Sequence, residues 1–444
     1  MKLLQFYLLL FSLLILNNYM LNAQWEETNG PPYIEITSSL ATIITDSGDT
    51  NLYSGTYVGG VFLSTNSGDS WKNSVGNWDN NNGGFTKKNI TALLPIKDDE
   101  GNLYLFAGTK GDGIFLSVNN DTNWLAVNTG LMNTYVYDII SIDTFLFAVA
   151  DTAELSASGG VFRSSNKGAS WIGTNNGLTE TSATSLAVYK DKTGTVNLFA
   201  GTWNGGVYHS TDYGENWIKY DNELTNYSIS DIVVMDTILF VAANSTVFRS
   251  INNGVSWIFA NSNLPSSVSF LAVNDTIIYV LAGREIYYSL DRGLEWYDGG
   301  YVDHDIKCMK VGGKYLFLGI DAPFGISNSV WRRPLSEINK PMAIKYEPEF
   351  PYNFKLYQNY PNPFNPRTTI SWEWGIGSNI QIKIFDFLGR EVKTLVNQYY
   401  SPGYHSITFN ARDLSSGVYF YCIGVKSEGN INIFTKTRKL LLLK

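Results

Sequence analysis

The residues of this chain best suited to binding a ligand are four aromatic side chains and one carboxylate in segments expected to be loops. They are Tyr57, Trp78, Asp151, Trp203 and Tyr301. Aromatic rings offer large apolar faces, and a carboxylate accepts hydrogen bonds from hydroxyl or amide groups. Such a set suits a carbohydrate or a peptide. We expect these residues to form a ligand site if the fold gathers their loops.

Residues for catalysis or for binding a metal are harder to find. The three histidines, His209, His304 and His405, lack the spacing typical of metal ligands. No glycine-rich phosphate loop and no Ser–His–Asp or Cys–His arrangement stands out. The sequence therefore assigns no catalytic residue, no metal site and no cofactor.

Composition and charge narrow the class of protein. The chain has 444 residues, which suggests two or three domains. Aromatic residues make up 14% and charged residues 16%, with 40 glycines, a mixture that favours many short strands joined by tight turns. The net charge of −8 argues against a nucleic-acid partner, which requires a clustered basic face.

The first residues have the features of a signal peptide. Lys2 precedes an apolar run from Leu3 to Leu16, and Ala23 offers a small residue for cleavage. The run is shorter than the roughly 20 residues that a spanning helix needs. We expect residues 1–23 to be cleaved, with a membrane anchor as the alternative. No later stretch is expected to span a bilayer.

The two cysteines, Cys308 and Cys422, fall in different expected domains. We therefore expect free, buried thiols, which pack as small apolar side chains.

A repeated phrase, Ser-x-Asn/Asp-x-Gly-x-x-Trp, organises most of the chain. Five copies match the phrase fully: Ser64–Trp71, Ser164–Trp171, Ser210–Trp217, Ser250–Trp257 and Ser289–Trp296. A sixth copy, Ser117–Trp124, has Asp121 in place of glycine. Each copy follows three short apolar segments and opens a fourth. Units of four strands at this length are typical of propeller blades.

The blade number follows from the two ends of the repeat region. Trp25 begins a fourth strand that lacks three preceding ones, whereas the segments from Asp305 to Arg332 form three strands that lack a fourth. Joining them predicts a closed ring of seven blades over residues 24–338, followed by a linker at 339–355. Closure removes the open sheet edges on which other chains could pair.

The repeat resembles the Asp-box of sialidases, sortilin-type receptors, xyloglucan-degrading propellers and a photosystem assembly factor. The resemblance implies that the box is a turn between third and fourth strands, on the face away from the usual ligand site. The residue types agree with this implication: Asn or Asp bonds nearby amides, Gly allows positive φ, and Trp packs between blades.

The composition changes at Leu356. Residues 360–366 read YPNPFNP, and segments with alternating apolar residues follow, such as Ile380, Ile382 and Ile384. Since proline cannot donate to a sheet ladder, the opening segment is expected to be a turn and an edge. The pattern predicts a small antiparallel β-sandwich over residues 356–444.

This domain resembles the type A sorting domain of the type IX secretion system. The resemblance rests on YPNPFNP, on residues 385–392 (FDFLGREV), on residues 416–419 (SGVY) and on the terminal residues 439–444 (KLLLLK). It implies passage through the periplasm, recognition by the secretion machinery, and a protein that is secreted or attached to the outer-membrane surface. The alternative is a generic sandwich adhesion module.

Two classes of function remain. A sialidase-like enzyme would need a cluster of three arginines and an early Arg-Ile-Pro, but Arg163, Arg249 and Arg332 occupy one repeat position and no Arg-Ile-Pro occurs. A xyloglucanase-like enzyme would need two carboxylates across a cleft. We therefore expect a non-catalytic module that binds a glycan, peptide or protein, with a glycan-active hydrolase as the alternative.

Overall fold

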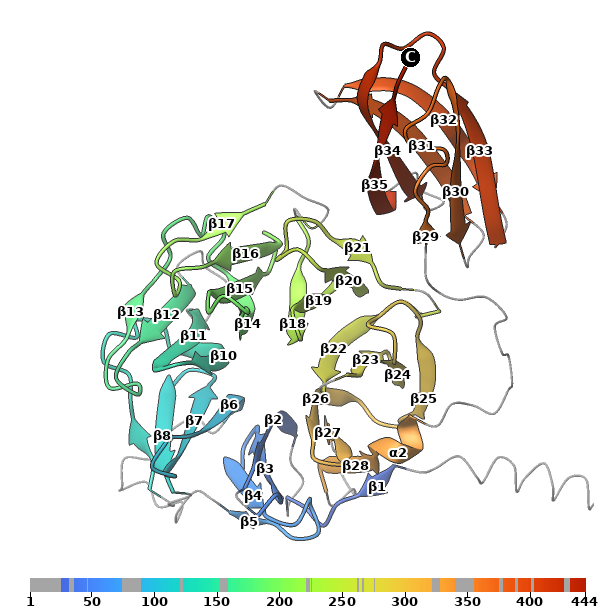
Figure 1. Cartoon of the computed structure of the whole chain (residues 1–444). Helices are drawn as coiled ribbons and strands as arrows, with labels where there is room; N and C mark the ends of the chain where they lie inside the picture. Colours follow the sequence, from blue (N-terminus) through green and yellow to red (C-terminus); the bar gives the residue numbers. More distant parts are fainter. Residues whose placement is uncertain are drawn as a thin grey trace, which may run out of the picture. The chain divides into compact units, whose positions relative to one another are not determined.

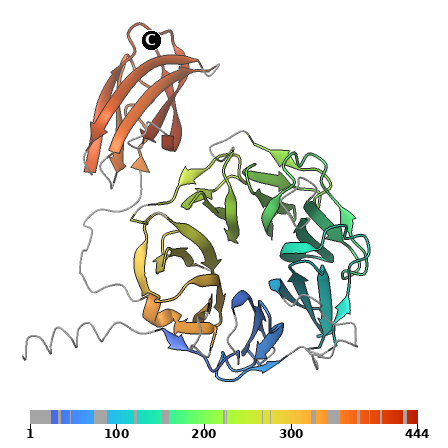
Figure 2. The same cartoon turned by 180° about the vertical axis from the view of Figure 1, so that it is seen from behind.

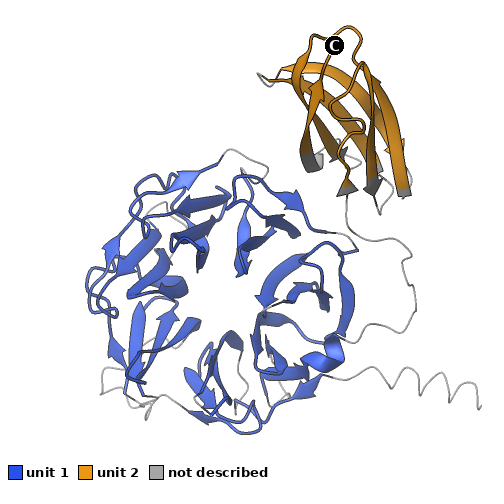
Figure 3. Cartoon of the chain, in the orientation of Figure 1, with its two compact units in different colours: residues 1–340 blue, residues 341–444 orange. Residues whose placement is uncertain are grey.

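The computed structural model divides the chain into two compact units, Met1–Lys340 and Pro341–Lys444 (Figure 3). The residues that it describes are 25–31, 36–45, 47–73, 89–119, 123–151, 159–220, 224, 226–261, 263–265, 267–274, 276–321, 328–339, 355–374, 378–387, 390–400, 403–426 and 432–444. The expected signal peptide, 1–23, lies outside these residues, as does the expected linker apart from its two end residues.

Seven antiparallel four-stranded sheets make up the described part of the first unit, and Figure 1 shows them as blades in a ring. Blades 1 to 3 are β2 (Thr37–Ile44), β3 (Thr50–Thr56), β4 (Val61–Ser64) and β5 (Lys72–Asn73); β6 (Ile90–Lys97), β7 (Leu103–Thr109), β8 (Ile114–Val118) and β9 (Leu125–Ala126); and β10 (Tyr135–Ile142), β11 (Phe145–Asp151), β12 (Gly160–Ser164) and β13 (Ile172–Gly173).

Blades 4 to 6 continue the same order of four consecutive strands. They are β14 (Ala183–Lys190), β15 (Val196–Thr202), β16 (Val207–Ser210) and β17 (Ile218–Lys219); β18 (Ile229–Met235), β19 (Ile238–Ala243), β20 (Thr246–Ser250) and β21 (Ile258–Phe259); and β22 (Val268–Val273), β23 (Ile278–Ala282), β24 (Glu285–Ser289) and β25 (Tyr297–Tyr301). Blade 7 consists of the N-terminal strand β1 (Glu26–Glu27) together with β26 (Ile306–Gly312), β27 (Tyr315–Ile320) and β28 (Val330–Pro334). A short helix, α2 (Leu335–Ile338), follows β28.

The ring closes in two ways. The first strands β2, β6, β10, β14, β18, β22 and β26 contact one another in order, and β26 contacts β2; Figure 2 shows the same closed ring from behind. In blade 7, β1 pairs with β28 in antiparallel register, with Glu26 opposite Arg332. The seven-bladed propeller expected from the repeats is thus confirmed, including the blade shared by the two ends.

The repeat turns join third to fourth strands through the bonds expected of them. In blade 1 the Asn66 carbonyl oxygen Oδ1 accepts the amide of Ser70 at 2.9 Å, and the Ser64 hydroxyl accepts the amide of Gly68 at 2.7 Å. The other four full copies make the same pair of bonds. Gly68 has φ 98°, a conformation that glycine adopts at low cost. The box residues therefore stabilise turns.

The repeat tryptophans hold neighbouring blades together. The indole Nε1 of Trp171 donates to the Val127 carbonyl of blade 2 at 2.8 Å, and that of Trp217 donates to the Thr174 carbonyl of blade 3 at 2.7 Å. Trp171 is 3% exposed and shares an apolar cluster with Phe106 of blade 2. Each such ring buries a large apolar area at a blade boundary.

The arginines at one third-strand position also connect blades. Each donates Nη1 to a carbonyl in the repeat turn of the next blade: Arg163 to Tyr213 at 2.9 Å, Arg249 to Arg292 at 2.8 Å and Arg332 to Ser67 at 2.6 Å. They are spread around the ring, so they form no cluster for a substrate carboxylate. This arrangement agrees with the sequence argument against a sialidase-type site.

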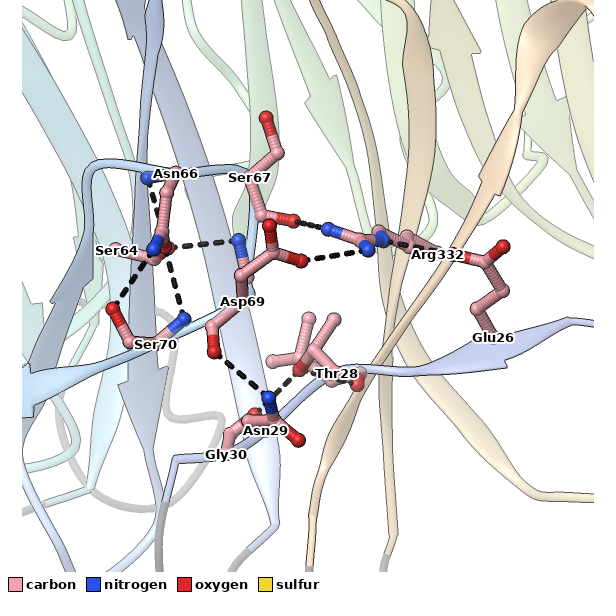
Figure 4. A network of polar contacts seen from close by, with 12 residues as sticks. Glu26, Thr28, Asn29, Gly30, Ser64, Asn66, Ser67, Asp69, Ser70 and Arg332 are labelled. Atoms are coloured by element: carbon pink, nitrogen blue, oxygen red, sulfur yellow. Dashed lines mark hydrogen bonds and ion pairs between the residues drawn. The ribbon is translucent and has the colours of Figure 1, made fainter.

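The last of these arginines lies at the closure and makes additional contacts (Figure 4). The Arg332 guanidinium forms ion pairs with Glu26 at 3.1 Å and Asp69 at 2.8 Å, linking β1, β28 and the turn of blade 1. It also lies 4.9 Å from the centre of the Tyr315 ring. Nearby, the Thr28 hydroxyl donates to the Val330 carbonyl at 2.8 Å. Ion pairs, hydrogen bonds and a ring contact therefore hold the N-terminal strand and blade 1 to β28.

The second unit is an antiparallel sandwich. One sheet has the order β29 (Lys355–Leu356), β30 (Arg367–Trp374) and β33 (Gly403–Asn410); the other has β32 (Glu391–Tyr400), β31 (Ser378–Asp386), β34 (Gly417–Lys426) and β35 (Asn432–Leu442). Trp372 from the first sheet and Ile382 and Leu440 from the second are 0% exposed in one apolar cluster. The expected sandwich is confirmed.

The opening and terminal motifs of this unit lie side by side. The amide of Phe364 donates to the Leu441 carbonyl, and the amide of Leu443 donates to the Phe364 carbonyl, both at 3.0 Å. The Asn362 side chain accepts the amide of Leu441 at 2.9 Å. The proline-rich segment therefore completes the edge beside the chain end.

Both cysteines are free and half-buried, one in each unit. Burial raises the pKa of the Cys308 thiol to about 12.

We predict that Arg332→Ala destabilises the propeller more than Arg249→Ala does. Both changes remove one bond to a repeat turn, but Arg332 also holds the N-terminal strand through its ion pair with Glu26. Hydrogen bonds of a charged group contribute about 1.5–3 kcal/mol. Urea unfolding of both variants checks this, with proteolysis at the N-terminus as a second readout. Equal losses of stability in the two variants would show that closure depends on other contacts.

Candidate functional site

Four of the five expected ligand residues lie in the part of the chain that the structure describes, and strand direction places them at one end of the ring. Second and fourth strands end at the face opposite the repeat turns, which we call the loop face. Asp151 ends β11 and Tyr301 ends β25, while Tyr57 and Trp203 follow β3 and β15. The fifth residue, Trp78, lies outside the described residues.

A pocket of about 400 Å³ on the loop face brings two of these residues together. It is formed by blades 3, 4 and 5, and we call it the Tyr137–Trp203 pocket. Its lining residues are Tyr137, Asp151, Ser182, Ala183, Thr184, Trp203, Ile229 and Ser230. Tyr57 and Tyr301 do not line it, although they are 50% and 56% exposed. Its volume is within the range of small-molecule sites.

Tyr137 lies at a β-bulge that recurs in the first strand of every blade. Each first strand shifts register at its second or third residue, and one residue there is left without a partner. The residues at this position are Ser38, Thr91, Tyr137, Thr184, Ser230, Ser269 and Lys307. Most blades have a residue with a hydroxyl group on a short side chain at this position, whereas blade 3 has the aromatic ring of Tyr137.

Three of the hydroxyls at this bulge connect neighbouring blades. Ser38 donates to the Ile90 carbonyl at 2.5 Å, Thr184 donates to the Ile229 carbonyl at 2.6 Å, and Thr91 donates to the Val136 carbonyl. Tyr137 has a ring instead, which is 41% exposed and lines both the pocket and the central channel. An alignment of the repeats would have shown that tyrosine replaces serine or threonine at this position. Only the structure shows that the position is a bulge and that the ring lines the pocket.

Trp203 is an exposed ring on a fixed backbone. Its amide donates to the Ser182 carbonyl at 2.9 Å, and its carbonyl accepts the Ser228 hydroxyl. The side chain is nevertheless 55% exposed. Two hydrogen bonds thus anchor the backbone of this residue, and its ring presents apolar area to the pocket.

Asp151 is the acidic residue among the described lining residues of this pocket. It is 1% exposed, in contrast to Tyr137 and Trp203. Burial and, second, the charge of Asp151 raise the pKa of Tyr137 above its ordinary value, so this phenol stays protonated at neutral pH. The pocket thus combines two accessible rings with one deep carboxylate.

The central channel, about 540 Å³, contains a second set of charged residues. Asp138 and Asp231, each one residue past a bulge, line it with Lys310. Asp138 Oδ2 accepts the amide of Leu186, and Asp231 Oδ2 accepts the amide of Leu271, both at 2.8 Å. Both carboxylates therefore bond the backbone of the next blade.

Burial in the channel wall raises the pKa of Asp138 to about 6 and that of Asp231 to about 7. The charge of Asp138 contributes further to the shift of Asp231.

His209 packs as part of the propeller core. Its ring stacks on Phe199 with centroids 4.6 Å apart, and its Nε2 lies 3.0 Å from Asn197 Oδ1. Burial lowers its pKa to about 4, so the ring is neutral at physiological pH. Among the described residues, no group of three or more His, Cys, Asp or Glu side chains has a geometry suited to a metal ion.

Comparison with protein families finds a match over residues 358–437 to the secretion system C-terminal sorting domain. A search of curated protein sequences finds no match.

Solved structures similar to this chain are larger propeller proteins. The extracellular domain of the hybrid two component system BT4673 from B. thetaiotaomicron matches with a TM-score of 0.54 and 15% identity, over 95% of this chain and 59% of that one. The corresponding domain of BT3049 matches at 0.50 and 14%, over 94% and 58%. A GH74 xyloglucanase from Xanthomonas campestris matches at 0.49 and 14%, over 82% and 58%.

These structural likenesses show the propeller fold alone, because the identities are low. The chain spans less than two thirds of the length of each of these structures. The xyloglucanase has too low a TM-score to support an inference about activity.

The sorting-domain match establishes how the protein is delivered. The second unit is a type IX secretion sorting domain, and the chain is an exported propeller that is secreted or displayed on the cell surface. Its partner in export is the type IX machinery. Where the structure describes the chain, it shows no helix with the length and apolar character needed to cross a bilayer.

We predict that Asp231→Asn changes the pH dependence of stability. The folded-state pKa of Asp231 is raised, so the folded protein holds this proton more tightly than the unfolded chain does. Its contribution favours folding at low pH and is lost as the pH rises from about 4 through about 7.

An asparagine still accepts the Leu271 amide but cannot ionise. The melting temperature of the variant relative to the wild type should therefore increase between about pH 5 and about pH 8. Asp138→Asn should behave similarly around a midpoint near pH 6. A constant difference across this range would contradict the assignment.

Proposed function

We propose that this exported propeller is a non-catalytic binding module that presents the Tyr137–Trp203 pocket to a glycan, peptide or protein ligand. The observation that carries the proposal is a single pocket lined by two exposed rings, Tyr137 and Trp203, and one buried carboxylate, Asp151. A few polar groups within an apolar, aromatic lining are typical of ligand sites.

The lining of the pocket argues against hydrolysis. A glycosidase needs an acid and a second carboxylate, both within reach of the glycosidic bond. Of the described residues that line the pocket, only Asp151 carries a carboxylate, and it is 1% exposed. Binding without bond cleavage fits this arrangement.

A glycan-active hydrolase remains the second candidate because of the channel carboxylates. Raised pKa values in a cavity are a feature of catalytic acids, and Asp138 and Asp231 have them. Both, however, already accept backbone amides of neighbouring blades. If they were catalytic, Asp231→Asn would abolish a glycosidase activity of the wild type; as a structural group, Asp231 would leave binding unchanged when replaced.

The proposal includes a processing scheme. Residues 1–23 direct export to the periplasm and are removed, residues 24–338 bind the ligand, and residues 339–355 link the propeller to the sorting domain at 356–444. The apolar run Leu3–Leu16 and the position of Ala23 support the first step.

We predict that Trp203→Ala weakens binding of any ligand found by glycan and peptide arrays by about tenfold or more, since a buried aromatic contact contributes roughly 1–3 kcal/mol. Tyr57→Ala is the matched control, because Tyr57 has the same place after a second strand and a similar exposure but lies outside the pocket. Titration calorimetry measures both. Equal effects of the two changes, or none, would place the ligand elsewhere.

We also predict that deleting residues 439–444 leaves the propeller folded and blocks export. The deletion removes Leu440 and Leu442, which are 0% exposed in the sandwich core, but nothing from the propeller. Fractionation should find the chain in the periplasm with protease resistance of the propeller unchanged. Leu443→Ser, at a site 51% exposed, is the control and should still be exported. A truncated chain that reaches the surface in normal amounts would refute the prediction.

A further inference from the structure

We infer that Asp138, in the wall of the central channel, is a positioning residue of the Tyr137–Trp203 pocket and that its protonation changes the shape of the pocket. The inference rests on the proposed function and adds a regulation of that same site by pH. Its basis is a pair of hydrogen bonds that the Asp138 carboxylate accepts beside the bulge of blade 3 and from the first strand of blade 4.

Three of the residues that line the pocket are bulge residues of consecutive blades, namely Tyr137, Thr184 and Ser230. A bulge residue has no partner in the strand ladder, so its orientation depends on what holds the backbone on either side of it. The residue that follows each bulge is therefore well placed to fix it. In blade 3 this residue is Asp138.

Asp138 ties the bulge of blade 3 to another wall of the pocket. Its Oδ1 accepts the amide of Ile139, and its Oδ2 accepts the amide of Leu186, both at 2.8 Å. Ile139 belongs to β10, the strand that contains Tyr137, and Leu186 belongs to β14, two of whose residues line the pocket. One carboxylate thus holds the backbone next to Tyr137 and the strand that forms the neighbouring wall.

Similar bonds follow the next two bulges but differ in strength or in place. The Ser185 hydroxyl accepts the amide of Ile232 at 3.3 Å, a longer bond to an uncharged acceptor. The Asp231 carboxylate accepts the amide of Leu271 at 2.8 Å, but Leu271 lies in β22, from which no described residue lines the pocket. Asp231 is therefore a matched control, because its bond leads away from the pocket.

Protonation reduces the number of bonds that Asp138 can accept. The carboxylate offers one oxygen to each amide, whereas a protonated carboxyl has one good acceptor for the two. Burial raises the pKa of Asp138 to about 6, although the hydrogen bonds from Leu186 and Ile139 act in the opposite direction and so favour the ionised form. We expect the bulge to be held firmly above about pH 6 and to loosen below it.

Few other charged groups face Asp138. Among the described residues that line the channel, the others are Asp231 and Lys310, and the charge of Lys310 lowers the pKa of Asp138. The neighbouring first strands, β6 and β14, contribute uncharged residues to this lining. On the side of the pocket, Asp151 ends β11, and the raised pKa of Tyr137 keeps that phenol protonated. Asp231, whose pKa burial raises to about 7, titrates in a similar range, so variants must separate the two aspartates.

Hydroxyl-radical labelling of the chain from residue 24 to residue 444, measured by mass spectrometry, tests the inference without a ligand. It reports the accessibility of the Tyr137 ring, and Tyr57, which is 50% exposed outside the pocket, is the reference in the same sample. In the wild type, the labelling of Tyr137 relative to Tyr57 should rise at least about twofold from pH 8 to pH 5, with a midpoint near pH 6.

Three variants assign the effect to Asp138. Asp138→Asn has one acceptor at every pH, so its labelling at pH 8 should equal that of the wild type at pH 5 and should not change with pH. Asp138→Ala should be labelled at least as strongly. Blade 2 has alanine at the corresponding place, Ala92, so we expect this variant to fold, and thermal melting verifies it. Asp231→Asn should keep the wild-type pH profile.

Two results would overturn the inference. One is labelling of Tyr137 that does not change with pH in the wild type or that Asp138→Asn leaves unaltered. The other is a pH profile that Asp231→Asn abolishes, because the effect would then come from the channel as a whole. Either result leaves the proposed function standing if Trp203→Ala weakens the binding of an array ligand. The expected labelling, together with an array ligand insensitive to Trp203→Ala, would support the role of Asp138 and refute the proposed function.

Discussion

The structure depends on one constraint, namely that every blade is held by the next around a closed ring. The hydrogen bond that Arg332 donates to the repeat turn of blade 1 meets this constraint where the ring closes. Each of blades 1 to 6 consists of consecutive strands and continues directly into the next blade. Along the chain, blade 7 is connected to blade 1 only through β1, a strand of two residues that pairs with β28 by non-covalent contacts. The same type of bond recurs at Arg163 and Arg249. At the closure, ion pairs to Glu26 and Asp69 reinforce it. An unclosed blade would expose a sheet edge and the ring of Trp25.

Three layers of contacts connect the blades, and the candidate site includes a bulge at which a tyrosine ring stands in place of a hydroxyl. Tryptophans act near the outer strands, arginines act at the repeat turns, and hydroxyls or carboxylates act at the bulges that line the channel. In blade 3 the bulge residue is Tyr137, whose ring takes the place of a short hydroxyl side chain and lines the Tyr137–Trp203 pocket. The repeated blades form a closed frame, and a departure from the repeat lines the pocket that we propose as the ligand site.

The second unit serves delivery and has its own core. Its first and last motifs bond each other, so a change at the chain end affects the proline-rich segment as well. This proximity gives a physical reason why motifs almost eighty residues apart occur together in such a domain. The described apolar core cluster of this unit consists of its own residues, from Leu356 to Leu442.

The sequence by itself determined the strand repeat, the seven blades, the shared closing blade, the sandwich and the export route. These features depend on local patterns: a turn needs Asn or Asp and Gly at fixed spacing, and a strand with one buried face needs alternation. It also placed Asp151 and Trp203 at one end of the ring, because strand direction follows from counting strands. The tertiary structure alone decided that these two meet Tyr137 while Tyr57 and Tyr301 lie apart. Contacts across blades join residues about forty positions apart or more. Their geometry depends on how the bulges and the ring closure orient each first strand.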